Sequence, residues 1–470
     1  MTSDRIPHGS WSDVFRRDRV PAIVVLSGGV LLHSMNVLML ATVLPSIVGE
    51  MGGATMMAWP TTAYLASSIV AATCTGLITT SLGARATFAI GTLIFGVGAL
   101  ACALAPSMAV VVSGRFVQGL GGGMLTAVPY VLVRTTLPEN LWARAIGLLS
   151  SMWSVSILVG PMVGGAFARF DFWRGAFYTV AAIAALLAVV ALRVLPRATA
   201  ASDKRPAIPG GRVALICAAI AILSSAAIVA DPLAKAALIV TAVAALILMM
   251  RVDRRAEAPL LPSDAFSPFT TTGLGLWMVL LLAIAYSPLS IYVPIFLQRL
   301  HGLDPLASGY VAAGTSIGWT LASIVVAGAA GAWPNRLILG GPLLMAVSLL
   351  FTAWLTAPGP IAALCVAVTA VGIGIGLPWS FIAERVMRGA REGEGTIGAT
   401  AVATVQQMGF ALGGAIAGLS ANSSGLTTTL EQAGVLNAAF WTTAVFVVPA
   451  ALAAMVSVRL VRMAPPLAGR

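Results

Sequence analysis

Fourteen apolar stretches dominate this chain, and each is long enough to be considered as a helix that crosses a lipid bilayer. A transmembrane helix needs about 20 mainly apolar residues. Only 9% of the 470 residues are charged, which is too few to cover the surface of a soluble protein of this size. We therefore expect an all-α integral membrane protein. The stretches lie at 20–46, 57–80, 86–105, 109–133, 143–168, 174–194, 212–230, 233–250, 271–298, 306–331, 336–356, 360–383, 397–420 and 436–458.

The positive charges indicate how these spans are oriented. Cytoplasmic loops of membrane proteins carry an excess of Lys and Arg. With a cytoplasmic N-terminus, 22 of the 27 Lys and Arg fall on the inside and four on the outside, while Arg115 lies within a span. The sequence thus predicts a multi-pass protein of the cell (inner) membrane with both termini in the cytoplasm.

Two polar linkers suggest the domain organisation. They are "RVLPRATAASDKRPAIPGGR" (193–212) and "RVDRRAEAPLLPSDAFSPF" (251–269), and they bracket the short seventh and eighth spans. If these two spans do not both cross the bilayer, the count falls to twelve and the orientation is unchanged. The predicted parts are a cytoplasmic N-terminus (1–19), an N-terminal six-helix bundle (20–196), a linker with two extra helices (197–270), a C-terminal six-helix bundle (271–458) and a cytoplasmic tail (459–470).

Composition also excludes several kinds of partner. The net charge of +11 sits in short loops, not on one face of a soluble domain, so we expect no nucleic-acid binding. The four Cys lie inside apolar stretches, and three His show no metal-ligand spacing. We expect no metal and no cofactor.

The stretch "GRFVQGLGGGMLTAVPYVLV" (114–133) carries the strongest local signal. Arg115 is a cation inside a span, where it must face water, a partner or a ligand. Gln118 follows one turn later. Gly119 and Gly123 form a small-xxx-small face that allows close helix packing, and packing alone explains most of these glycines.

The stretch "GPMVGG" (160–165) has the same character. Gly160 and Gly164 form a second small-xxx-small face beside Gly165, and Pro161 removes a backbone donor and favours a kink. Tight packing at a bent helix explains these residues, and that interface could also move during a conformational change.

Together these motifs resemble the major facilitator superfamily, in its fourteen-helix drug:proton antiporter branch. "RFVQGLGGG" resembles its fourth-helix signature, "GPMVGG" its fifth-helix antiporter signature, and "WRGAF" the start of its sixth helix. "WPTTAYL" (59–65) and "IFLQRLHGLDPLASG" (295–309) resemble two further patterns. The resemblance implies two six-helix bundles with pseudo-two-fold symmetry, alternating access, and efflux of amphiphilic compounds by antiport, as in multidrug resistance.

Two positions depart from the family pattern. In the loop "GLITTSLGAR" (76–85), Gly76, Gly83 and Arg85 match, but Thr80 replaces the expected Asp. A Thr offers only neutral hydrogen bonds, roughly half as strong as charge-assisted ones, so this conformational lock should be weaker. In "MNVLMLATVLP" (35–45), Asn36 replaces the Asp that normally carries the proton.

No other acid replaces that Asp near the middle of a predicted span; Glu384, at an inner span end, comes closest. The remaining coupling candidates are His33, Asn36, Arg115 and Gln118. For His33, coupling, substrate contact and helix packing stay open. An Arg without an embedded acid predicts a net positive cavity, which favours neutral, zwitterionic or anionic substrates over permanent cations.

Several aromatic and amide side chains are candidates for contact with the substrate, although aromatic residues in spans often face lipid or pack between helices. Gln406 and Gln407 point about 100° apart, so at most one should line a cavity squarely. The candidates are Trp59, Tyr64, Trp153, Tyr286, Tyr292, Gln298, Trp319, Trp379, Phe381, Gln406 and Gln407.

The leading hypothesis is therefore a secondary active exporter of an amphiphilic organic compound, driven by a proton gradient. The alternative is a proton-independent facilitator or a lipid or amphiphile transporter, because Asn36 replaces the acid. An intramembrane enzyme is disfavoured, because His33 alone supplies neither a nucleophile nor a metal site. We expect a monomer in contact with membrane lipids, its small substrate and protons.

Overall fold

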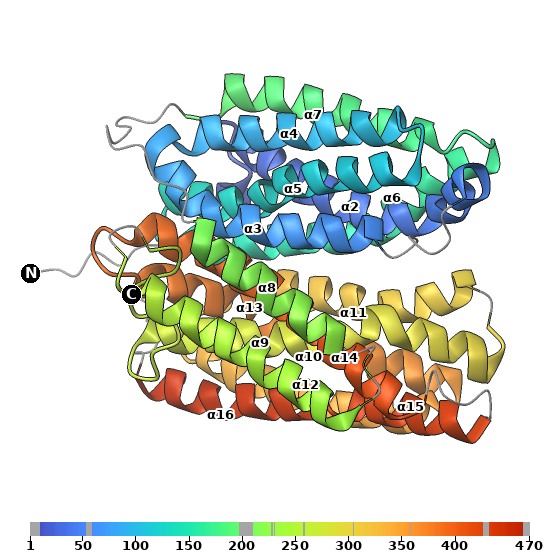
Figure 1. The fold of residues 1–470 in the computed structure, drawn as a ribbon. Coiled ribbons are helices and arrows are strands. Elements are labelled where there is room, and N and C mark those ends of the chain that lie inside the picture. Colours follow the sequence, from blue (N-terminus) through green and yellow to red (C-terminus); the bar gives the residue numbers. More distant parts are fainter. Residues whose placement is uncertain are drawn as a thin grey trace, which may run out of the picture. The chain divides into compact units, whose positions relative to one another are not determined.

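The computed structural model describes residues 10–52, 59–196, 210–226, 229, 231–256, 259–303, 305–357, 359–425 and 432–463, and within these ranges every regular element is a helix (Figure 1). Most of the first predicted linker, residues 197–209, lies outside the described residues. The chain divides into two compact units. We call them the N-terminal unit, made of the described residues within 10–196 and 391–404, and the C-terminal unit, made of the described residues within 210–390 and 405–463.

The N-terminal unit is built from one short and six long helices. The short helix begins at a capping box in which Ser10 and Asp13 bond each other's backbone N–H groups. The helices are α1 (Trp11–Val14), α2 (Val20–Met51), α3 (Trp59–Leu82), α4 (Ala84–Ala103), α5 (Met108–Thr136), α6 (Trp142–Arg169) and α7 (Arg174–Val194), with a 3₁₀ turn, η2, at Glu139–Leu141.

The C-terminal unit contains the extra helix pair and the second set of long helices. Its helices are α8 (Gly210–Ala226), α9 (Pro232–Asp253), α10 (Thr271–His301), α11 (Pro305–Val326), α12 (Trp333–Thr356), α13 (Ile361–Gly389), α14 (Gly395–Ser423), α15 (Gln432–Ala444) and α16 (Val447–Met463). The division between the units falls within α14, whose first residues belong to the N-terminal unit.

Each unit is organised around one glycine-rich helix. In the N-terminal unit α5 packs against both α3 and α4, and in the C-terminal unit α13 packs in the same way against α11 and α12. Both central helices contain an internal proline, Pro129 in α5 and Pro378 in α13. In both units a central helix with an internal proline thus packs against two neighbouring helices, although the sequences of the two units show no obvious repeat.

Thirteen helical segments in the described part of the chain are long and apolar enough to cross a membrane. The seventh predicted span corresponds to α8, of which 17 residues are described. The last predicted span is two helices, α15 and α16, which together form one candidate span. They part just before Pro449, whose ring nitrogen cannot donate the next helical hydrogen bond.

The extra helix pair, α8 and α9, packs against helix α14 of the C-terminal unit. Helices α8 and α9 lie side by side (Figure 1), and Ala242 of α9 packs against Ala415 of α14. At the end of α9 the buried carboxylate of Asp253 forms an ion pair with Arg212 of α8 and accepts hydrogen bonds from the backbone N–H groups of Leu260 and Leu261, at 2.9 and 3.0 Å. This carboxylate holds the second linker against both helices.

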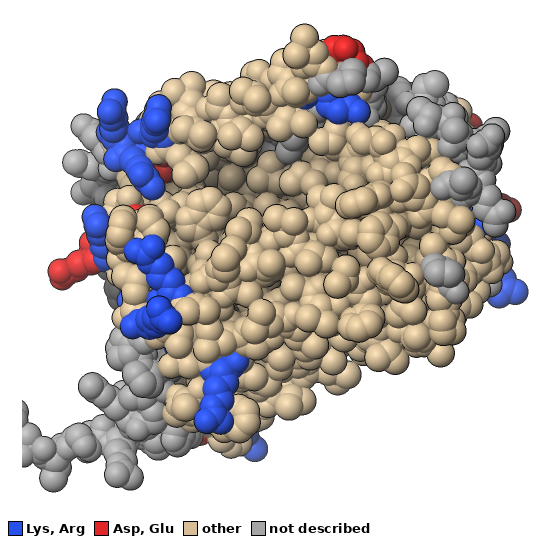
Figure 2. All heavy atoms as spheres, turned by 90° about the horizontal axis from the view of Figure 1, so that it is seen from below, with Lys and Arg blue, Asp and Glu red and all other residues tan. Residues whose placement is uncertain are grey.

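The surface has the character expected of a membrane protein. Figure 2 shows one face on which Lys and Arg lie along the margins of a broad area without charged side chains. Large apolar side chains are exposed along the helices of the C-terminal unit, including Leu343, Phe351 and Trp354 of α12 and Val448 and Met455 of α16. Such an area is suited to lipid tails.

Candidate functional site

The candidate site of the N-terminal unit is built where α2, α3 and α5 meet. The glycines of α5 make this meeting possible. A Cβ on Gly119 would collide with the backbone carbonyl of Tyr64, and one on Gly123 would collide with that of Ser68, both on α3. Gly121 makes a similar approach to α4, and a Cβ on Gly122 would lie 2.7 Å from the ring of His33 on α2. The glycine cluster therefore brings polar side chains of three helices together.

Arg115 is at the centre of this arrangement and is almost completely buried, with 1% of its surface exposed. Its Nη1 donates a hydrogen bond to Gln118 Oε1 at 2.7 Å, and its Nε donates to the carbonyl of Pro60 at 3.4 Å. The guanidinium also lies 4.0 Å from the centre of the Tyr64 ring, which is a cation–π contact. Gln118 in turn donates from Nε2 to Asn36 Oδ1 at 3.2 Å. Arg115 thus reaches Asn36 through Gln118.

His33 is the second polar centre and is fully buried. Its Nδ1 lies 2.8 Å from the Tyr64 hydroxyl, and its ring packs edge-on against Trp153 with centroids 5.8 Å apart. Its Nε2 has no hydrogen-bond partner among the described residues. Tyr64 therefore contacts both His33 and Arg115. Because buried polar atoms are normally paired, the open nitrogen of His33 marks a position for an additional donor or acceptor.

No carboxylate joins this network in the described part of the chain. Among the described residues of the N-terminal unit, Arg115 is the one charged side chain that is buried. Neutral oxygens and an aromatic ring offset its charge only in part, and a buried charge without an opposite charge is costly. The network is consequently a positively charged site, with Asn36 accepting a hydrogen bond from Gln118.

The motif at residues 76–85 covers the end of α3, Gly83 and the start of α4, and its side chains make local contacts. Gly83 has a positive φ of 77° and separates α3 from α4, a conformation that favours glycine. Thr80 donates its hydroxyl hydrogen bond to the carbonyl of Leu77 in its own helix, at 2.7 Å. Arg85 is half-buried in the first turn of α4, and a Cβ on Gly76 would touch the side chain of Thr400 in the same unit.

The second small-residue face packs α6 against α2. A Cβ on Gly160 would lie 2.8 Å from the carbonyl of Met35, and one on Gly164 would lie 2.8 Å from that of Met39. Gly165, the next residue, has open space around its Cα. Pro161 lies within the continuous helix α6. The close approach therefore depends on Gly160 and Gly164 and not on Gly165.

Four candidate aromatic residues take part in ring clusters of the C-terminal unit. Tyr286, Trp319 and Trp379 form one cluster, which Phe410 completes: the Tyr286–Trp319, Trp319–Trp379 and Tyr286–Phe410 centroids are 5.4, 5.1 and 5.8 Å apart. Tyr292 instead packs beside Phe296 at the contact with α15. Sequence reasoning named the Tyr and Trp residues of these clusters but neither Phe296 nor Phe410, which are ordinary apolar residues whose positions depend on helix packing.

The remaining candidates differ in how deeply they are buried. Phe381 and Gln407 are buried, Gln406 is half-buried, and Gln298 is exposed and donates to Ser308 Oγ at 3.0 Å. Trp59, at the start of α3, is 57% exposed. Glu384 is buried in α13 and forms an ion pair with Arg388, one turn later, at 2.7 Å.

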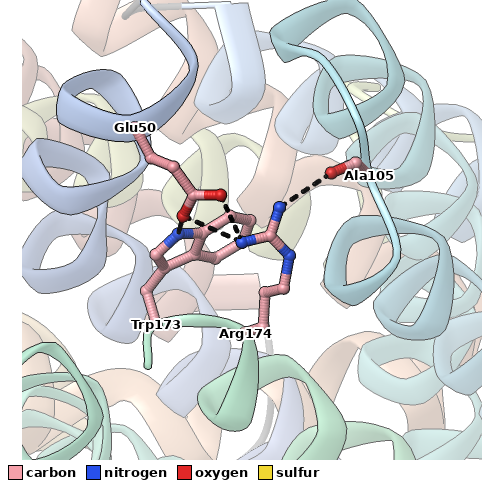
Figure 3. Close-up of polar contacts among 4 residues, drawn as sticks. All are labelled: Glu50, Ala105, Trp173 and Arg174. Atoms are coloured by element: carbon pink, nitrogen blue, oxygen red, sulfur yellow. Dashed lines mark hydrogen bonds and ion pairs between the residues drawn. The ribbon is translucent and has the colours of Figure 1, made fainter. Parts of the chain in front are cut away.

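A cluster at one end of the N-terminal unit was not foreseen from the sequence (Figure 3). Glu50, near the end of α2 and beyond the candidate span Val20–Leu40, accepts hydrogen bonds from Arg174 Nη1 at 2.7 and 2.8 Å and from Trp173 Nε1 at 2.6 Å. Arg174 also donates to the carbonyl of Ala105 at 3.2 Å. This cluster ties α2, the α4–α5 connection and the start of α7 together. The motif "WRGAF" was the available signal, but its partner lies 124 residues away.

Stability should depend on pH through this cluster. The hydrogen bonds from Arg174 and Trp173 hold the pKa of Glu50 below its usual value. The ionised carboxylate therefore stabilises the fold above the pKa of an unfolded Glu, about 4.3, and this contribution disappears as the pH falls through the lower folded-state pKa. We expect Glu50→Gln to lower the thermal unfolding midpoint slightly at neutral pH, because half-exposed ion pairs contribute little.

The control for this prediction is Asp171→Asn, which removes another acid from the same end of the unit. It should leave the midpoint unchanged. Differential scanning fluorimetry of the purified protein between neutral and acidic pH measures both variants. A Glu50→Gln deficit that persists at the lowest pH would contradict the ion-pair explanation.

Two glycine-centred helical units, many apolar spans and a buried polar network among the described residues define a class of protein, namely a secondary membrane transporter. The chain belongs to the Major Facilitator Superfamily, whose family model matches residues 26–418. It is thus a multi-pass membrane transporter of a small molecule and not an enzyme.

Known proteins agree with this membership. A probable multidrug-efflux transporter of Mycobacterium tuberculosis is 33% identical over 442 residues, covering 90% of this chain and 92% of that protein. Two solved structures share the fold at 13% sequence identity. The human organic anion transporter MFSD10 aligns with a TM-score of 0.70 over 94% of this chain and 100% of its own, and the proton:xylose symporter XylE with 0.67 over 96% and 97%.

Proposed function

We propose that this transporter exports amphiphilic organic compounds by alternating access and that it prefers neutral or anionic compounds to permanent cations. The M. tuberculosis relative is described as a probable multidrug-efflux transporter, which supports export of such compounds. The preference follows from one observation: Arg115 is buried without a carboxylate among the described residues of its unit. A cationic substrate would add a second positive charge to this low-dielectric region, whereas an anion would offset the first.

A proton gradient is the proposed energy source, with His33 as the group that exchanges the proton. A neutral imidazole is a good candidate for this role, because it can accept a proton where Asn36 cannot. His33 Nδ1 is engaged with Tyr64, and Nε2 is open. Proton arrival at Nε2 would place a second cation near Arg115, and the resulting repulsion would bias the unit towards another conformation.

A second candidate function is facilitated transport without protons, including movement of lipids or lipid-like amphiphiles. The observation that favours it is Asn36, which occupies the position of the usual acid and accepts a hydrogen bond from Gln118. A carrier of this kind would equilibrate its substrate and would not concentrate it.

The proposed surroundings of the transporter follow from its charge distribution. The excess of Lys and Arg in one set of loops supports a place in the inner membrane with both termini in the cytoplasm. We further propose that the chain acts as a monomer surrounded by lipid.

Transport in proteoliposomes tests these proposals. The probes are a dansyl fluorophore with a sulfonate tail and the same fluorophore with a trimethylammonium tail. Each is followed with and without an imposed pH gradient for wild type, His33→Ala, Asn36→Asp and the double variant that carries both substitutions. We expect wild type to transport the sulfonate preferentially and the gradient to accelerate it; His33→Ala should abolish the acceleration, and Asn36→Asp should restore gradient dependence in the His33→Ala background.

The outcomes separate the candidates. Faster transport of the trimethylammonium probe would contradict the charge preference. Transport by wild type without any effect of the gradient would favour the facilitator. Gradient-driven transport that survives in His33→Ala would exclude His33 as the proton-exchanging group.

A further inference from the structure

The aromatic cluster of the C-terminal unit contains two buried hydrogen-bond donors without a partner in the described part of the chain. Trp319 of α11 and Trp379 of α13 are 6% and 1% exposed. Neither indole Nε1 has an acceptor among the described residues. An unpaired buried donor costs about 1–3 kcal/mol, and buried indole N–H groups usually have a partner. Two such donors on adjacent rings call for an explanation.

Close helix packing holds these two rings in place. Gly372 and Gly376 of α13 approach the backbone of α11 so closely that a Cβ on either would collide with it, at Thr315 and at Trp319. Pro378 fits against Gly341 of α12. The Trp319 and Trp379 rings consequently meet at a 64° angle with centroids 5.1 Å apart.

The other members of the cluster supply ring surface but no free acceptor. The Tyr286 hydroxyl is 2.9 Å from Ser316 Oγ and is therefore engaged, while Phe410 adds a second ring beside Tyr286. Tyr286 is the central residue of α10, so the cluster lies at the depth where transporters of this architecture bind substrates. The nearest charged residues along α13, Glu384 and Arg385, are roughly 8 Å farther along the helix.

We propose that this cluster, Tyr286, Trp319, Trp379 and Phe410, is a substrate subsite for uncharged aromatic groups that carry a hydrogen-bond acceptor, such as an aryl ketone or amide. The rings stack on the aromatic part of the compound. The two indole N–H groups donate to its acceptor, which relieves the cost of leaving them unpaired. This inference rests on the proposed export of amphiphiles and specifies a substrate class for it.

The site discriminates by polarity as well as by shape. A site with unpaired donors rejects a compound that lacks the acceptor, because its donors then stay unpaired. Aromatic faces can also attract cations. In this cluster, however, the free polar atoms are donors, so a quaternary ammonium group leaves them unpaired.

Binding of two neutral probes of the same shape tests the proposal on the full chain in lipid nanodiscs. Benzophenone has two rings and a carbonyl, and diphenylmethane has the same rings and a methylene group. We expect benzophenone to bind roughly fivefold more tightly for each donor that it engages, after subtraction of binding to empty nanodiscs. Trp319→Phe and Trp379→Phe should each remove about one such factor, whereas Trp354→Phe, which changes an exposed Trp on α12, should not.

Nuclear magnetic resonance gives a readout that does not depend on affinity. With ¹⁵N-labelled tryptophan, the N–H signals of Trp319 and Trp379, assigned through the two Phe variants, should move downfield with benzophenone and not with diphenylmethane. The proposal would be overturned if benzophenone and diphenylmethane bound with equal affinity, or if benzophenone left the indole N–H signals unchanged. It would also be overturned if benzyltrimethylammonium bound more tightly than benzophenone. Transport of the dansyl probes by wild type tests the proposed function separately. A failure of the proposed subsite can therefore be distinguished from a failure of the proposed function.

Discussion

Arg115→Ala is expected to slow transport of the sulfonated dansyl probe by roughly a hundredfold, which corresponds to about 3 kcal/mol and to the loss of charge-assisted hydrogen bonds from a buried site. The substitution removes the hydrogen bonds to Gln118 and Pro60 and the contact with the Tyr64 ring. It should also abolish the preference for the sulfonated probe over the trimethylammonium probe. Initial rates in proteoliposomes measure both effects.

Arg115→Lys serves as the informative second variant. Lysine keeps the charge but cannot donate in two fixed directions while lying flat on a ring. It should therefore retain the charge preference at a reduced rate. Arg174→Ala, which removes an Arg from the cluster around Glu50, should leave the preference intact. If Arg115→Ala transports both probes like wild type, Arg115 does not determine selectivity.

Gly119→Ala is expected to destabilise the protein by about 3 kcal/mol or more, the upper range for overpacking a tightly packed interior. The added methyl group would meet the Tyr64 carbonyl and Ser67 on α3, which cannot move away as a flexible side chain could. The α3–α5 contact would open, and with it the network of Tyr64, Arg115 and His33. The measurements are the thermal unfolding midpoint in detergent and the transport rate.

Gly165→Ala provides the matched control, since Gly165 is a helical glycine of the neighbouring motif with nothing near its Cα. There, alanine should stabilise the helix by about 1 kcal/mol through its higher helix propensity. The two substitutions are chemically identical, but Gly119→Ala should lower the stability of the protein and Gly165→Ala should raise it. A wild-type midpoint for Gly119→Ala would mean that the close approach of α3 and α5 is not required.

Patterns within one helix predicted much of the candidate site. The spacing of Arg115 and Gln118 places them one turn apart, and the structure joins them by a hydrogen bond. Length and hydropathy predicted the helices, because a membrane span is constrained by bilayer thickness. Thirteen candidate spans result in the described part of the chain, and the remaining prediction, the seventh span, corresponds to the shorter described helix α8.

Contacts between helices that are far apart in the chain could not be predicted from the sequence. The bond between Tyr64 and His33 depends on the register of α3 against α2, which the glycines of α5 determine sterically. The pairing of Glu50 with Arg174 and the place of Phe410 beside Tyr286 depend in the same way on tertiary packing. A single sequence reveals which side chains are unusual at membrane depth, but not which of them meet.

The buried Arg115 without a carboxylate in the described part of its unit also bears on electrical energy. When a monoanion leaves a cell whose interior is negative, the membrane voltage itself does work on it, about 2.3 kcal/mol per charge at 100 mV. This corresponds to a concentration ratio of roughly 50-fold. Under the proposed preference for anions, the fixed, non-titrating charge of Arg115 would let the transporter draw on voltage in addition to the proposed proton gradient. Export of such an anion would be electrogenic, as a consequence of a site in which Arg115 connects through Gln118 to Asn36 and not to an acid.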